Sequence, residues 1–302
     1  MSATCPLLMN VIIWLIMSTS ISQAPINIVY LHSHDTGRYI QPYGYALQTP
    51  HMQKFAEHGV LFRQAFCVGP TCSPSRAGLL TGQSAHSSGM LGLAHRGWGL
   101  TDYKQHLLHT LKAQGYHTAL AGLQHIAHGP ECATKVIGYD QAIPWNNSYA
   151  QVTDNAITIL RERKDKNQPF FLSAGYLLTH RTNKKGESVQ WHCHEDSPLG
   201  DSRYVMPPAP LPDTPITRKD FADFAVSAKR LDDQYGQILQ TLEDTGLGQE
   251  HTGHYHHRSR DRFPAHEVQP DRPWDGGLVD DARSTGQRLY RWQSGGQHGQ
   301  PH

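Results

Sequence analysis

The sequence predicts an α/β fold in which a mainly parallel sheet is flanked by helices on both faces. Short apolar runs with strand character alternate with amphipathic helical stretches, an order typical of parallel sheets. The chain has 302 residues, which is enough to bury a large core. Reactive side chains follow the expected strands, and such groups meet at the carboxyl edge of a parallel sheet. We therefore expect the functional site at that edge.

The expected strands are short apolar runs bounded by turn-forming residues. The first begins after Pro25 and ends before a polar turn, and the last is strongly apolar throughout. Runs of this length and composition are typical of buried strands. The four strands are expected at residues 25–32, 60–66, 116–123 and 169–178.

The expected helices end at glycines. Gly59 and Gly115 each follow a helical stretch, where a glycine commonly ends a helix. The stretch before Gly115 places Leu107, Leu108 and Leu111 on one face, as an amphipathic helix packed on a sheet requires. The helices are expected at about residues 50–58, 77–82, 102–115, 155–165 and 216–246.

Residues 1–24 are expected to lie outside the folded domain. They hold an apolar run from Pro6 to Met17, which is too short for a stable membrane span and suits the core of a cleaved export signal. The predicted location is therefore secreted or periplasmic, or lysosomal in a eukaryote. A start codon assigned too far upstream is the alternative, and it would leave the protein in the cytoplasm.

Composition argues against several other classes of function. The net charge of +1 gives no indication of a nucleic-acid or anionic-membrane partner. The cysteines are too few and too scattered for a disulfide scaffold, and they form no C-x-x-C pair. They lie at positions 5, 67, 72, 132 and 193. One of them, Cys72, opens the most informative segment of the chain.

The segment CSPSRAGLLTG, residues 72–82, carries the chemistry. This segment resembles the signature of the type I sulfatases, which belong to the alkaline-phosphatase-like superfamily. The residues that carry the resemblance are Cys72, Pro74 and Arg76, each two positions after the last, followed by Leu79, Thr81 and Gly82. The resemblance covers roughly residues 25–250 and is strongest to sulfatases related to N-sulfoglucosamine sulfohydrolase. Its other blocks are PINIVYLHSHD, LTGQSAHSSGMLGL, GLQHIAHG, PFFLSAGYLLTHR and DSRYVMPPAPLPDTP.

The resemblance implies that Cys72 is oxidised to formylglycine by a formylglycine-generating or sulfatase-maturating enzyme. A hydrated aldehyde suits sulfate transfer, because one hydroxyl attacks sulfur and the other then re-forms the carbonyl and expels sulfate. Arg76 is expected to hold the hydrate or a sulfate oxygen. Pro74 is expected to keep the segment extended, with the helix at 77–82 aiming its N-terminus at the anion. The implied substrate is a sulfated small molecule or glycan.

A divalent metal, Ca²⁺, is also implied by the resemblance. The family usually has two adjacent aspartates after the first strand, whereas this chain has His34 and Asp35. Asp35 matches the second aspartate and is expected to bind the ion together with the modified Cys72. Calcium prefers oxygen ligands, so His34 is a poor substitute for an aspartate. Both a ligand role and a supporting loop role for His34 stay open.

Two histidines are expected to move protons or contact sulfate. His125 lies where the family has a Lys-x-His block, but Leu123 replaces the lysine. His125 is expected to protonate the leaving oxygen or bind the intermediate, and His180 to contact sulfate or act as an acid. Each could instead be an ordinary hydrogen-bonded loop histidine. His86 and His95 are weaker candidates on the substrate side.

Residues 251–302 do not match the domain before them. They lack Ile, Met, Lys, Asn and Cys, so they cannot form the buried strand that the family has after its long helix. That strand ends in Asp-His-Gly or Asp-Asn-Gly and supplies further metal ligands. If the codons from His251 onward are read one nucleotide later, the degeneracy of the genetic code permits the sequence T-L-V-I-T-T-T-D-H-G. We therefore interpret the tail as out of frame, with disorder as the alternative, and expect a truncated catalytic domain at 25–250 that binds metal weakly.

Two other functions remain open from the sequence. A phosphatase or phosphodiesterase of the same superfamily would generally use Thr or Ser as its nucleophile, so Cys72 favours sulfate. The other alternative is an inactive truncated remnant, in which Cys72 stays an unmodified buried thiol. We predict a sulfuric ester hydrolase that acts on sulfate esters or N-sulfates, with the sugar substrate assigned by analogy alone.

Overall fold

The computed structural model describes residues 26–129, 131–144, 148–182, 190–191, 200–209 and 211–248. The expected export signal at residues 1–24 and the tail at 251–302 lie outside the described residues. Within the described part of the chain, no helix combines the length and the apolar character that crossing a membrane would require.

A four-stranded parallel sheet forms the centre of the described chain, which confirms the predicted α/β class. The strand order is β1-β4-β2-β3. His32, Gly175 and Gly122 are partners in register, so β1, β4 and β2 end level at one edge. A separate antiparallel pair follows β4. The strands are β1 (Ile28–His32), β2 (His117–Gly122), β3 (Gln141–Pro144), β4 (Phe170–Gly175), β5 (Arg181–Thr182) and β6 (Gln190–Trp191).

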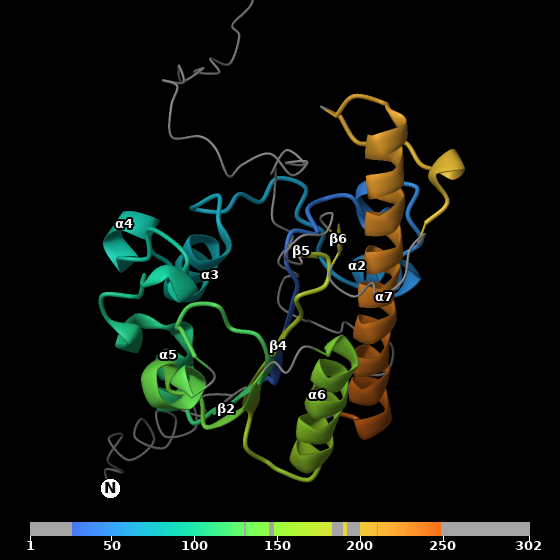
Figure 1. Ribbon diagram of the computed structural model, residues 1–302. Coiled ribbons are helices and arrows are strands. Elements are labelled where there is room, and N and C mark those ends of the chain that lie inside the picture. The colour runs from blue at the N-terminus through green and yellow to red at the C-terminus, as the bar shows by residue number, and fades with distance from the viewer. Residues whose placement is uncertain are drawn as a thin grey trace, which may run out of the picture.

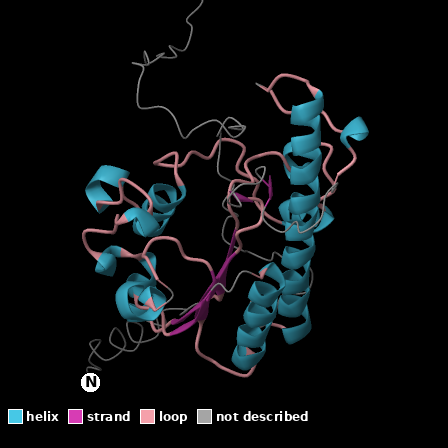
Figure 2. Ribbon diagram, in the orientation of Figure 1, coloured by secondary structure: helices cyan, strands magenta, loops and turns pink. Residues whose placement is uncertain are grey.

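Helices cover both faces of the sheet, as predicted (Figure 1). Figure 2 shows the strands between two helical layers, with α3, α4 and α5 on one side and α2, α6 and α7 on the other. The α-helices are α2 (Pro50–His58), α3 (Cys72–Thr81), α4 (Ala85–Ser88), α5 (Leu107–Ala113), α6 (Tyr149–Arg163) and α7 (Pro215–Thr245). Shorter helical turns cover Gln41–Tyr43, Ala94–Arg96, Tyr103–Gln105, Ala133–Ile137 and Ser202–Tyr204.

Successive residues of each central strand pack into different cores. On β2, Ala119 and Ala121 belong to the core that includes α6 and α7, whereas Leu120 belongs to the core that includes α3 and α5. On β4, Leu172 and Phe171 divide in the same way. A parallel sheet that is buried on both faces needs such continuous apolar runs. The packing fixes the sheet, and therefore the loops that leave its carboxyl edge.

The predicted strand at residues 60–66 is wrong. The segment is irregular, and Val60, Phe62 and Phe66 are 77%, 57% and 77% exposed. None of the four strands in the described sheet pairs with it. Its composition suits a strand, but a strand forms only where a neighbour accepts and donates its backbone hydrogen bonds.

Other boundaries differ from the prediction for local reasons. The unpredicted β3 is short and ends in Pro144, which an edge position tolerates. The α6 helix begins earlier than expected, because the Ser148 hydroxyl accepts a hydrogen bond from the Gln151 amide. The α5 helix begins later, after His106 accepts a hydrogen bond from the Leu108 amide.

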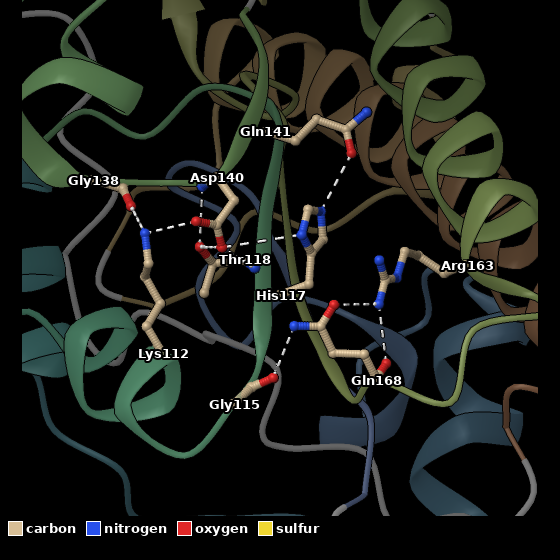
Figure 3. A network of polar contacts seen from close by, with 9 residues as sticks. All are labelled: Lys112, Gly115, His117, Thr118, Gly138, Asp140, Gln141, Arg163 and Gln168. Atoms are coloured by element: carbon tan, nitrogen blue, oxygen red, sulfur yellow. Dashed lines mark hydrogen bonds and ion pairs between the residues drawn. The ribbon is translucent and has the colours of Figure 1, made fainter.

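A polar network fixes the opposite, amino-terminal end of β2 (Figure 3). The Asp140 carboxylate accepts hydrogen bonds from the amide and the hydroxyl of Thr118, both at 2.9 Å. Lys112 approaches the same carboxylate at 2.6 Å. Partial burial opposes the charge of Asp140, but the hydrogen bonds from Lys112 and Thr118 outweigh burial and lower its pKa.

Candidate active site

Three loops at the carboxyl edge of the sheet hold residues in a strained backbone conformation. Asp35 follows β1, His125 follows β2 and Thr179 follows β4, and their φ angles are 54°, 57° and 48°. Positive φ is uncommon outside glycine, and such residues concentrate at functional sites. In the described chain they are the only non-glycine residues in this region of φ. The edge that the sequence singled out is therefore also the strained part of the structure.

Hydrogen bonds join the loop after β1 to the loop after β4. The Thr179 hydroxyl donates to the His34 carbonyl at 2.5 Å and lies 2.7 Å from the Thr36 hydroxyl. The Ser33 hydroxyl lies 2.6 Å from that of Thr36. In return, the His34 amide donates to the Leu178 carbonyl at 3.1 Å. These buried bonds offset the strain at Asp35 and Thr179, and they fix the backbone of His34.

Cys72 is the first residue of α3, which begins earlier than predicted. The expectation of an extended segment at Pro74 is wrong, because Pro74 lies in the first turn of the helix. Proline is tolerated there, since the first turn leaves its amide positions without helical partners. Cys72 is 6% exposed and forms no disulfide. Its position at a helix N-terminus favours a negative group.

Arg76 is buried beneath the site. Its guanidinium donates to His32 Nδ1 and, at 2.8 Å, to the Ser33 carbonyl oxygen, and the residue is 1% exposed. His32 Nε2 in turn lies 3.1 Å from the Ser173 hydroxyl. Burial, reinforced by the Arg76 charge, lowers the pKa of His32 well below its usual value. Arg76 thus anchors α3 to the end of β1 and supplies positive charge behind the site.

Four histidine rings gather at the strand ends. The His34 ring centroid lies 5.4 Å from that of His125 and 5.6 Å from that of His180. His95 stacks on His125 and lies 3.1 Å from its Nε2. Burial, followed by the charge of Arg76, lowers the pKa of His125 to about 4. The same two causes lower the pKa of His34 well below its usual value, so both imidazoles are neutral at neutral pH.

The structure brings most of the predicted site residues together. The candidate ligand atoms of His34, Cys72 and His125 all lie within 4.8 Å of one another. Asp35 faces His180, with 3.6 Å between its Oδ2 and the imidazole Nε2. The carboxylate is therefore adjacent to this group without belonging to it. The predicted roles of these residues, and of Arg76, remain predictions.

Sequence reasoning missed the supporting residues. Ser73 has no role of its own in the motif, yet its hydroxyl joins α3 to the loop of His125. His32 and Thr179 also hold the site without any pattern that marks them. His95 was a weak substrate-side candidate, and its contact with His125 places it within the cluster. For His32 and Thr179, the available signal is their position at the ends of expected strands.

A pocket of about 340 Å³ opens beside the histidine cluster. Leu123, His125 and His95 line it together with residues of the following loop and Pro144 at the end of β3. Leu123 replaces the expected lysine, so this wall is apolar at that position. The pocket gives a bound molecule access to the side of the cluster where His125 and His95 meet.

Comparisons with known proteins identify the family. The family model described as Sulfatase matches residues 26–252. The chain is 33% identical over 225 residues to human N-sulphoglucosamine sulphohydrolase, an alignment that covers 67% of this chain and 44% of that protein. The chain belongs to the sulfatase family. Members of this family are sulfuric ester hydrolases. The chain spans less than half the length of this curated relative.

Solved structures agree with the assignment to the sulfatase family at the level of fold. A Bacteroides fragilis protein whose crystal structure is titled as that of a putative sulfatase has a TM-score of 0.59 and 20% identity, covering 78% of this chain and 62% of that chain. A phosphonate monoester hydrolase from Silicibacter pomeroyi has a TM-score of 0.53 and 16% identity, covering 74% and 60%. The alkaline-phosphatase-like fold is confirmed. Because both hydrolases share it, the fold alone does not decide between sulfur and phosphorus substrates.

Proposed function

We propose that this sulfatase-family chain hydrolyses a sulfate ester or an N-sulfate of a sugar through a formylglycine derived from Cys72. The observation that carries the proposal is the position of Cys72. It lies buried at the N-terminus of α3, with His34 and His125 within 4.8 Å. The helix N-terminus and the positive charge of Arg76 both favour binding of an anion at this point, so a nucleophile here would face the sulfate group of a substrate.

The proposed chemistry divides between Cys72 and the surrounding histidines. Conversion of the thiol to an aldehyde is an oxidation that removes sulfur, so a maturation enzyme must supply the oxidant. Once hydrated, formylglycine supplies one hydroxyl to attack sulfur and a second whose deprotonation re-forms the aldehyde and releases sulfate. The S–O or S–N bond of the substrate breaks, and its oxygen or nitrogen departs with a proton. The net reaction consumes one water.

His180 is the better of the two predicted proton donors. It lies beside the Asp35 carboxylate at 3.6 Å, which can orient its ring. His125 has a pKa lowered to about 4 by burial and by Arg76, so it is neutral at neutral pH and suits hydrogen bonding to the anion better than proton donation. We therefore assign the acid role to His180 and a binding role to His125.

The described donors do not complete the calcium site implied by the resemblance. Calcium takes about six to eight oxygen ligands, whereas the described group of candidate ligand atoms contains two imidazoles and a thiol. Asp35 remains the proposed carboxylate ligand for a divalent metal. The chain's own residues provide the nucleophile, the positive charge and the proton donor, and no step proposed here passes through the ion.

The substrate class follows from the relatives. The human relative's name specifies a sulphated glucosamine nitrogen, so we propose glucosamine N-sulfate and sulfated aminosugars as the first compounds to test. The proposed partners are this glycan and a formylglycine-generating or sulfatase-maturating enzyme. The proposed location is outside the cytoplasm or in a lysosome, since residues 6–17 resemble the core of an export signal.

Production of the chain with and without a formylglycine-generating enzyme tests the proposal. We expect the co-produced protein to carry an aldehyde at position 72 by mass spectrometry and to release sulfate from an aryl sulfate and from glucosamine N-sulfate. Cys72→Ala should abolish both signals, and Cys67→Ala, which changes a cysteine outside the site, should retain both.

Two outcomes would contradict the proposal. Turnover of an aryl phosphate or phosphonate in preference to the sulfate would favour the phosphohydrolase alternative. An aldehyde at position 72 without turnover of any sulfate, or an unmodified thiol under conditions that mature another sulfatase, would favour a remnant that retains only the anion pocket.

A further inference from the structure

The predicted nucleophile and two histidines form a compact set of nitrogen and sulfur ligands. His34 follows β1, Cys72 begins α3 and His125 follows β2. Their ligand atoms lie within 4.8 Å of one another. These residues come from three separate segments, so the topology of the fold, and not sequence proximity, brings one sulfur and two nitrogens to a single point.

Among the described residues, three of the four ring nitrogens of these two imidazoles have no hydrogen-bond partner. Within the described part of the chain, neither ring nitrogen of His34 has a hydrogen-bond partner, and His34 is 1% exposed. His125 uses Nε2 toward His95, whereas its buried Nδ1 has no partner among the described residues. A buried polar atom without a partner is costly, because it has lost its hydrogen bonds to water. A metal ion among these atoms would remove that cost.

The donor set selects the kind of metal. Thiolate and imidazole ligands suit Zn²⁺ and similar thiophilic ions, whereas Ca²⁺ requires oxygen. In a tetrahedral zinc site, bonds of about 2.0–2.3 Å place neighbouring ligand atoms roughly 3.5 Å apart. The separations here, all within 4.8 Å, exceed this value by at most about 1.3 Å, so zinc binding requires the ligand side chains to move closer by no more than that.

We propose that the chain with an unmodified Cys72 binds Zn²⁺ through His34, Cys72 and His125. The thiol releases its proton to solvent on binding, a Zn–S bond forms, and no electron is transferred. The fourth position stays available to water or another small ligand. This inference does not rest on the proposed hydrolase function, because it concerns the thiol and not formylglycine. Zinc binding and conversion of Cys72 to formylglycine are therefore mutually exclusive states of the same residue.

The histidine at position 34 makes this site particular to the chain. An aspartate there would offer the site an oxygen, as the resemblance to the family leads one to expect. His34 instead offers a buried nitrogen with no other described partner. The substitution thus shifts the ligand preference of the position from calcium toward zinc.

A second group of candidate ligands serves as an internal control. His51, Asp232 and Asp233 also lie close together. Asp232 is already engaged, because its carboxylate accepts hydrogen bonds from the amides of His51 and Met52 at 3.1 and 2.7 Å. This group has no sulfur, so a metal bound there gives no thiolate signal.

Cobalt absorption spectroscopy tests the zinc site directly. Co²⁺ replaces Zn²⁺ in tetrahedral sites, and a cobalt–thiolate bond gives a near-ultraviolet charge-transfer band that histidine-only sites lack. We expect the full chain, produced without a maturation enzyme, to develop this band with one Co²⁺. Zn²⁺ should abolish the band, and a large excess of Ca²⁺ should leave it unchanged. Because the chain has 21 histidines, the thiolate band is more informative than total metal content.

Variants assign the band to Cys72 and His34. Cys72→Ser and His34→Gln should each abolish the band or weaken Co²⁺ binding by about 100-fold or more, since even outer residues of metal sites contribute up to this amount. Cys67→Ser and His51→Gln should leave it unchanged. A chain in which Cys5, Cys67, Cys132 and Cys193 are all serine should keep the band, and this variant needs no change in the site. Circular dichroism checks that each variant is folded.

The proposal is overturned if the unmodified chain gives no thiolate band, if the band survives in Cys72→Ser, or if it is lost when only the other four cysteines are changed in a folded protein. Failure of sulfate turnover in the matured chain would not affect this result. The zinc site and the hydrolase function can therefore succeed or fail separately.

Discussion

The hydroxyl of Ser73 donates a 2.6 Å hydrogen bond to the backbone carbonyl of His125, and it accepts one from the Ala94 amide at 3.0 Å. The residue after Cys72 thus holds the loop of His125 against α3. Ser73 is 0% exposed, so water does not replace these partners when the hydroxyl is removed. This side chain therefore contributes to the spacing between Cys72 and His125.

We expect Ser73→Ala to destabilise the chain by about 1–3 kcal/mol, because it leaves a buried amide and a buried carbonyl without their partner. Denaturant unfolding measures the effect. Ser87→Ala, at an exposed serine in α4, should change the free energy of unfolding by less than about 0.5 kcal/mol. Equal effects of the two substitutions would show that the Ser73 hydrogen bonds contribute nothing to stability.

Acid should destabilise the chain through its buried histidines, and His106 offers the clearest test. Burial, with a smaller effect of His109, lowers the pKa of His106 from 6.5 to about 3. Between these two values the unfolded chain binds a proton that the folded chain does not. The free energy of unfolding therefore falls as pH decreases through this window.

We expect His106→Asn to reduce this pH dependence by about 1.4 kcal/mol per pH unit. Asparagine can still accept the hydrogen bond from the Leu108 amide that caps α5, so the helix should remain. Urea unfolding at a series of pH values from neutral to about 4 measures the slope. His86→Asn, at an exposed position, is the control. A slope unchanged in His106→Asn would show that His106 does not remain neutral in the folded state.

If His180 donates the proton to the departing group, its loss should depend on the substrate. In the matured chain, His180→Gln should lower kcat/KM by about 10²–10⁴ on a sugar sulfate, whose alkoxide departs poorly without a proton. The loss on a nitrophenyl sulfate, which has a good leaving group, should be much smaller. His58→Gln, at an exposed residue at the end of α2, is the control. Equal losses on both substrates would contradict the acid role and indicate a binding contact.

The sequence predicts a strand correctly where burial of both faces makes the strand continuously apolar. The runs that became β1, β2 and β4 are apolar because residues on both sides of the sheet enter a core. Residues 60–66 have a similar composition but lie in an irregular, exposed segment. Strand formation there depends on a pairing partner, and pairing is a property of the whole sheet. The β3 strand was missed because four residues ending in Pro144 carry too weak a pattern.

The site was predictable in its residues but not in its arrangement. Cys72, His125 and His180 could be singled out because each follows an apolar run or belongs to a motif. Their proximity depends on the strand order, in which β4 lies between β1 and β2. The positive φ at Asp35 and Thr179 has no sequence signal, because neither residue is glycine. Burial of Arg76 against His32 was also unpredictable, since the same arginine could have pointed toward the anion.

The remaining prediction is that the reading frame of the gene shifts near codon 250. The β1 strand lies at the edge of the described sheet. In the irregular segment after α2, Val60, Phe62, Phe66 and Val68 are all more than half exposed. An exposed strand edge and exposed apolar side chains both favour an additional strand. The shifted frame permits an apolar segment that ends in Asp-His-Gly, which would suit that role.

Sequencing of genomic DNA and transcript across codons 240–265 checks this prediction. We expect a single inserted or missing nucleotide near codon 250. The frame-corrected chain should bind Ca²⁺ more tightly than the chain as written, because its Asp-His-Gly segment would supply a second carboxylate ligand beside that of Asp35. Its free energy of unfolding should also be larger, because it buries more apolar surface. An uninterrupted frame through the last codon would contradict the frameshift. The composition of residues 251–302 would then be that of a natural tail, and the inactive remnant would become the favoured interpretation of the chain.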